Sequence, residues 1–141
     1  DEERAASMRL IAQCREELGD LREAQSWLYR AVAECPNVRE GHLALAKFGY
    51  RTGNWAMTYA AVKNALAIAS PSGSYLVEPE SWGGAPYDYG AIAAYHLGLY
   101  AEARAFAQIA CAANPDDARL KANLQRIEEK LGESEGEPCA P

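Results

Sequence analysis

A degenerate repeat is the feature that most constrains how this chain of 141 residues can fold. Three glycines each lie between two helix-like stretches, at successive separations of 34 and 45 residues: Gly19, Gly53 and Gly98. Two further series keep the same separations: Ala31, Ala65 and Ala110, and Pro36, Ser70 and Pro115. A recurring period of this length is typical of stacked helical repeats, because one unit cannot bury its apolar face alone.

The second separation is longer than the first because one segment is inserted. This insert, residues 70–84, has the sequence SPSGSYLVEPESWGG and is rich in Gly, Ser and Pro, which favour loops over helices. The repeat units are then residues 5–38, 39–71 and 84–117. We expect the insert to fold back onto the helices through its apolar residues, although its aromatic rings could instead stack on a ligand. These apolar residues are Tyr75, Leu76, Val77 and Trp82.

Each unit has the pattern of two amphipathic helices, with apolar residues at three- and four-residue steps. A glycine between them suits a left-handed helix end, and Asp20 and Asn54 can cap the helices that follow. Residues 118–131 form one further, mostly charged amphipathic helix, as expected of a solvating cap. The acidic tail, residues 133–141, should be disordered. These features predict one domain, residues 1–132, that is an all-α solenoid of three helix pairs and a capping helix.

Composition excludes several classes of function. The net charge of −6 disfavours binding to nucleic acid or anionic membranes. No apolar run approaches the roughly 20 residues that a membrane-spanning helix needs. The four cysteines lack metal-binding spacing, so we expect reduced thiols in a cytoplasmic protein. Because the chain begins at Asp1, we also expect it to be a piece of a longer protein.

No group of residues has the spacing of a catalytic centre. His42 and His96 fall in different units, without a cysteine or carboxylate at metal-ligand spacing. Glu78, Glu80 and Asp88 could suggest acid–base chemistry, but solvated charges are the simpler interpretation. We therefore expect no catalytic residue, no metal and no cofactor in this chain.

The repeat resembles the tetratricopeptide repeat. The chain matches four features of that family: the 34-residue period, the glycine after the first helix, the alanine of the second helix and the closing proline. The residues that match are the three series given above. The resemblance covers Ala5 to about Gly132 and implies a binding or scaffolding function. The second unit departs from the pattern, because Thr58 stands where the family prefers alanine and Ser70 replaces the closing proline. We expect this unit to be the least stable of the three.

A second resemblance covers Tyr75 to Ala103 and concerns the C-terminal helical region of certain bacterial and phage glycosyltransferases. The shared Trp-Gly-x-x-Pro-x-Asp pattern is formed here by Trp82, Gly83, Pro86 and Asp88. It implies that the chain is the accessory region of a larger bacterial glycosyltransferase and contacts that enzyme's catalytic domain. The alternative is a free-standing adaptor that recruits a protein partner. An enzyme in its own right is disfavoured because no catalytic group is present.

The first helices of a tetratricopeptide stack line a concave groove, and the resemblance implies which residues face it. Their mixture of charged, amide and aromatic side chains suits a protein or peptide partner, although an ordinary solvated face would have a similar composition. We expect the two tyrosines among them, Tyr50 and Tyr95, to point away from the core and anchor a partner. The predicted groove residues are Arg9, Gln13, Glu16, Leu43, Lys47, Tyr50, Asp88, Ile92, Tyr95 and Arg126.

One specialised function of the family is not supported by the sequence. Its chaperone-tail binders clamp a terminal carboxylate with paired Lys and Asn residues. Arg9 and Gln13 only loosely resemble the first pair, and Ala44, Ala85 and Tyr89 occupy the other clamp positions. We therefore expect this clamp to be absent.

Overall fold

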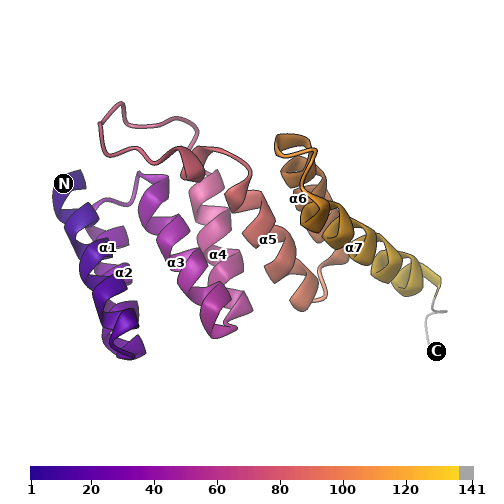
Figure 1. Cartoon of the computed structure of the whole chain (residues 1–141), viewed down its shortest axis with the longest axis horizontal. Helices are drawn as coiled ribbons and strands as arrows, with labels where there is room; N and C mark the ends of the chain where they lie inside the picture. Colours follow the sequence, from indigo (N-terminus) through magenta and orange to yellow (C-terminus); the bar gives the residue numbers. More distant parts are fainter. Residues whose placement is uncertain (137–141) are drawn as a thin grey trace.

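The computed structural model describes residues 1–136, which form seven α-helices and one short 3-10 helix. The helices pack as consecutive antiparallel pairs and a final helix, so the predicted all-α solenoid is confirmed (Figure 1). The elements are α1 (Glu2–Glu17), α2 (Leu21–Glu34), α3 (Arg39–Thr52), α4 (Trp55–Leu66), η1 (Pro79–Trp82), α5 (Ala85–His96), α6 (Tyr100–Ala113) and α7 (Ala118–Gly136).

The glycines of the repeat end the first helix of each pair, as predicted. Gly19, Gly53 and Gly98 have φ angles of 79°, 71° and 76°, a left-handed conformation that side chains with a Cβ disfavour. The second helix of a pair can then begin at once. Asp20 and Asn54 cap α2 and α4 by accepting hydrogen bonds from the backbone N–H groups three residues ahead.

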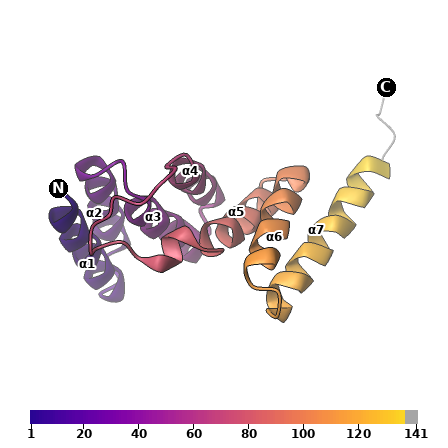
Figure 2. The same cartoon turned by 90° about the horizontal axis from the view of Figure 1, so that it is seen from above.

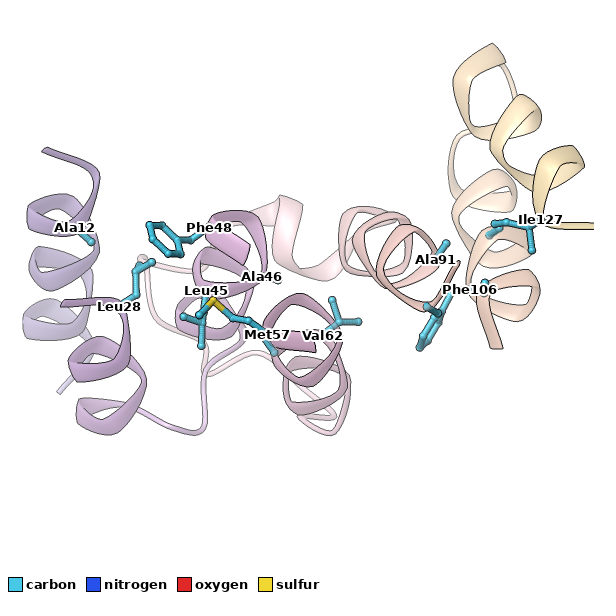
Figure 3. Close-up of a cluster of buried hydrophobic side chains, with 14 of the residues drawn as sticks. Ala12, Leu28, Leu45, Ala46, Phe48, Met57, Val62, Ala91, Phe106 and Ile127 are labelled. Atoms are coloured by element: carbon cyan, nitrogen blue, oxygen red, sulfur yellow. The ribbon is translucent and has the colours of Figure 1, made fainter. Parts of the chain in front are cut away.

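The core is one continuous cluster that runs through all the helix pairs into α7. It extends from Ala12 of α1 to Ile127 of α7, and large side chains such as Phe48 and Phe106 alternate with alanines (Figure 3). The three repeat alanines, Ala31, Ala65 and Ala110, are fully buried. Small residues at these positions let neighbouring helices pack closely, so the stack buries its apolar faces together.

Thr58, at the position where the repeat pattern prefers alanine, has a buried hydrogen-bond partner that the sequence did not indicate. Its side chain is fully buried, and its hydroxyl lies 3.2 Å from the carbonyl oxygen of Ala46 on α3. A Cβ built on Gly49 would lie only 2.5 Å from the same hydroxyl. The threonine therefore links α3 to α4 where the missing side chain of Gly49 makes room for it.

The insert folds back across the stack, as predicted. It runs from α4 toward α1 before it returns to α5 (Figures 1 and 2). Ser72 donates a hydrogen bond to Glu2 at 3.0 Å, and Tyr75 donates one to Glu3 at 2.7 Å. Tyr75 is 82% exposed, so this residue holds the insert through its hydroxyl and not by burial.

The C-terminal helix is longer than the sequence indicated. α7 continues to Gly136, so residues 133–136 are helical where a disordered tail was expected. The remainder of that predicted tail, which includes Cys139, lies outside the described residues. No helix within residues 1–136 is both long and apolar enough to cross a membrane.

Candidate functional site

The first turn of α3 holds the insert in place. The Glu40 carboxylate is only 4% exposed and accepts hydrogen bonds from the Trp82 indole and from the Glu78 backbone N–H, each at 3.1 Å. The Arg39 guanidinium lies 4.0 Å above the centre of the Trp82 ring and donates to the carbonyl oxygen of Ile68, just before the insert. Trp82 therefore anchors the insert, as we favoured from the sequence.

Sequence reasoning missed Arg39 and Glu40. Two adjacent charged residues in the first turn of a helix are normally solvated, because burial of a charge is costly without partners. Their partners in the insert lie 38 to 42 residues away along the chain, and no local pattern identifies them.

The insert forms one wall of a hollow on the face of the stack lined by the first helix of each pair, here called the groove face. This first hollow has a volume of about 800 Å³ and lies between α1, α3 and residues 75–79 of the insert. Leu43 is buried at its floor and offers almost no surface to a partner, which corrects its predicted role. The predicted groove residues that line this hollow are Arg9, Gln13, Glu16, Leu43 and Lys47.

The charges of the first hollow are paired within the chain. Glu78 of the insert lies 2.7 Å from Arg9 of α1, and Glu80 of the insert pairs with Lys47 of α3. At the far end of the hollow, Glu16 accepts hydrogen bonds from the Arg51 guanidinium, and this raises the pKa of Arg51. Every cation on this side of the groove face thus has a carboxylate partner.

A second hollow, of about 530 Å³, lies between α3, α5 and α7. Its lining includes four of the predicted groove residues: Tyr50, Ile92, Tyr95 and Arg126. Sequence reasoning missed Trp55 and His96, which also line it. Trp55 and His96 are 41 positions apart in the sequence, and their rings stack because the second and third units pack side by side. Only a model of how the units pack could have predicted this contact.

An unbroken series of aromatic contacts crosses the second hollow. Tyr50 packs edge-on against Trp55 with ring centres 6.0 Å apart, and Trp55 stacks on His96 at 4.0 Å with an angle of only 5° between the rings. His96 contacts Tyr95, which contacts Tyr100 of α6. These rings form a broad, partly exposed surface of the kind that binds extended peptides.

The two arginines that α7 adds to the second hollow differ in their pairing. Arg119 holds Asp88 through two contacts, of 2.6 and 3.2 Å, and these hydrogen bonds raise the pKa of Arg119. Asp88, a predicted groove residue, therefore lies in neither hollow and serves to fix Arg119. Arg126 is exposed and makes no ion pair with any residue of 1–136.

The described part of the chain offers no site for metal chemistry. No group of three or more His, Cys, Asp or Glu side chains within residues 1–136 is placed to hold a metal ion. Cys14, Cys35 and Cys111 are free thiols. The side chains that line the two hollows can offer aromatic stacking and charge pairing.

Solved structures of tetratricopeptide-repeat (TPR) domains are similar to this chain. The first TPR domain of Spaghetti (RPAP3), bound to the HSP90 peptide SRMEEVD, is 17% identical with a TM-score of 0.76, over 94% of this chain and 96% of that one. The first TPR domain of human RPAP3 is 16% identical with a TM-score of 0.75, over 98% and 100%. The Sgt2 TPR domain from Aspergillus fumigatus is 13% identical with a TM-score of 0.71, over 97% and 86%.

These likenesses show that the chain has the fold of a TPR domain, as the repeat predicted. No protein-family model matches the chain, and no curated protein matches its sequence. The expected link to a bacterial glycosyltransferase finds no support in these three structures.

Proposed function

We propose that this chain is a protein-interaction module that binds an extended peptide segment along its groove face, with the second hollow as the principal contact. The observation that carries the proposal is the aromatic series beside Arg126. It combines a broad stacking surface with a cation that has no partner in the described residues. Aromatic and arginine side chains supply most of the binding energy in typical interfaces.

The exposure of Tyr50 supports its role as an anchor. This side chain is 40% exposed while its ring is held by edge-on contacts with Trp55 and Tyr89. A tyrosine ring that is already ordered loses little conformational entropy when a partner covers it. Tyr95 is less suitable than predicted, because it is partly buried and packs against the core cluster. It forms the floor of the hollow and helps to hold the helices together.

Arg126 indicates the chemistry of the partner. An unpaired guanidinium beside aromatic rings favours a peptide that carries a carboxylate next to an apolar, aromatic or proline residue. The similar TPR domain of RPAP3 binds a peptide with several carboxylates, SRMEEVD. The clamp positions Ala44, Ala85 and Tyr89 lack the Lys and Asn side chains of the family's chaperone-tail binders. We therefore propose the same class of ligand, an acidic peptide segment, held here by stacking and by Arg126.

The test uses peptides selected by the chain itself. A displayed library of random twelve-residue peptides is selected on the wild-type chain, and the affinity of the enriched peptides is measured by calorimetry. Tyr50→Ala with Arg126→Ala should weaken binding by at least tenfold, as expected for the loss of two anchors. The matched control is Tyr29→Ala, because Tyr29 is 48% exposed on α2 and lies outside both hollows. Equal affinity for the wild type and the double variant would refute the proposed site.

A further inference from the structure

We propose that the insert sets the charge preference of the groove face. By neutralising Arg9 and Lys47, it makes the first hollow unfavourable for acidic residues. The partner must then carry its acidic residues only in the segment that lies over the second hollow, with apolar residues over the first. This inference rests on the proposed function, because it specifies the peptide that the groove face accepts.

Five cations lie along the groove face, and without the insert three of them, Arg9, Lys47 and Arg126, would have no carboxylate partner within residues 1–136. Arg51 and Arg119 would keep their pairs with Glu16 and Asp88. Arg9 belongs to α1, Lys47 and Arg51 to α3, and Arg119 and Arg126 to α7. Unpaired cations would then lie in both hollows and attract acidic residues of a bound peptide to each of them. The insert changes this for two of these cations, Arg9 and Lys47, which pair with Glu78 and Glu80.

The carboxylates of the insert are held next to these cations by their own backbone. The N–H of Glu78 is bound by the buried carboxylate of Glu40, and Trp82, two residues after Glu80, is fixed by the same carboxylate and by Arg39. A tethered group of this kind competes at a high effective concentration with any carboxylate that arrives on a separate molecule. An acidic ligand therefore gains little from Arg9 or Lys47 while the insert is in place.

The other residues that line the first hollow also disfavour an acidic side chain there. Glu16 and Glu17 line it, and Arg51 is already paired with Glu16. Its remaining surface is mainly apolar and includes Leu10 of α1 and Leu76 of the insert. An acidic side chain here would meet repulsion without an available cation, whereas an apolar side chain would bury its surface. In the second hollow the balance is reversed, because no carboxylate lines it and Arg126 makes no ion pair with any residue of the described part of the chain.

The test compares synthetic ten-residue peptides of identical composition that differ only in order. Two block peptides carry four glutamates in one half, either first or last, and leucine, proline and alanine in the other half. A third peptide distributes the same glutamates evenly. The wild-type chain should bind one block peptide at least threefold more tightly than the distributed peptide, a preference expected from two partly exposed ion pairs.

The decisive variant is Glu78→Gln with Glu80→Gln, which frees Arg9 and Lys47 but leaves the backbone contacts of the insert intact. It should bind the distributed peptide about three- to tenfold more tightly than the wild type, and added salt should weaken this gain. The matched control is Glu23→Gln with Glu135→Gln, which makes the same change in net charge at exposed positions outside both hollows and should change nothing.

The inference is overturned if the wild type shows no preference for either block peptide, or if that preference is unchanged in the insert variant. Its failure is distinguishable from that of the proposed function, which is judged by Tyr50 and Arg126 alone. A gain for the insert variant would support the inference even where the wild type binds the distributed peptide too weakly to measure.

Discussion

Replacement of Glu40 by alanine should release the insert while the helix pairs stay folded. The change leaves the Trp82 indole and the Glu78 backbone N–H without their acceptor. Hydrogen bonds to a charged group contribute about 1.5–3 kcal/mol each, but removal of a buried carboxylate also removes its desolvation cost. We expect a net local loss of about 2 kcal/mol, which corresponds to roughly 30-fold more frequent opening of the insert.

Hydrogen–deuterium exchange with mass spectrometry measures this opening directly. Peptides that cover residues 74–83 should exchange about 30-fold faster in Glu40→Ala, because opening becomes more frequent by that factor. Peptides from the N-terminal half of α6 should be unchanged, since α6 meets the insert at Gly84 through Ala110 and Ala113 near its C-terminal end. Glu40→Gln keeps one acceptor oxygen and should show a smaller effect. Equal exchange of the insert in the wild type and Glu40→Ala would refute the claim that Glu40 anchors it.

Three further predictions concern stability. Thr58→Val should lower the free energy of unfolding by about 1 kcal/mol, because the buried hydroxyl loses its bond to α3; urea denaturation that shows no loss would contradict this. Gly49→Ala should cost about 1–3 kcal/mol by overpacking against α4, whereas Gly41→Ala, whose added Cβ meets its nearest neighbour at 3.4 Å, should be neutral or stabilising in the same assay. The hydrogen bond from Lys63 lowers the pKa of Glu102 in the folded chain, so its contribution is present above the pKa of an unfolded glutamate and is lost as the pH falls. The melting temperature of the wild type should therefore fall more steeply below about pH 5 than that of Glu102→Gln, and parallel curves would count against the pair.

The repeat could be predicted from the sequence because its determinants are local. Each unit needs three kinds of residue at fixed positions: a glycine with a left-handed φ, a capping residue directly after it, and a small residue at the helix contact. In the second unit these are Gly53, Asn54 and Ala65. The residues of the groove face were implied by the resemblance to the tetratricopeptide repeat. Nine of the ten predicted groove residues line one of the two hollows, and Asp88 is the exception.

The features that could not be predicted are those made by partners far apart in the chain. In the sequence, Thr58 is only a departure from the repeat pattern, because nothing indicates that Gly49 makes room for its hydroxyl. In the sequence, Glu40 has the features of a surface charge, whereas in the structure the insert covers it and the Trp82 indole donates a hydrogen bond to it. The division of the groove face into a neutralised half and a basic half depends on where the insert lies, and its composition gives no indication of that path.

The central claim, that a peptide binds in the second hollow, is tested most directly by the three tryptophan indole signals in a ¹H–¹⁵N correlation spectrum. Each indole reports on a different place: Trp55 in the second hollow, Trp82 at the anchor of the insert and Trp27 on α2. The probe is the enriched peptide with the highest affinity from the library selection. Its titration should shift the Trp55 indole in a saturable manner and leave Trp27 unchanged. Saturable binding that shifts Trp27 and leaves Trp55 unmoved would contradict the account.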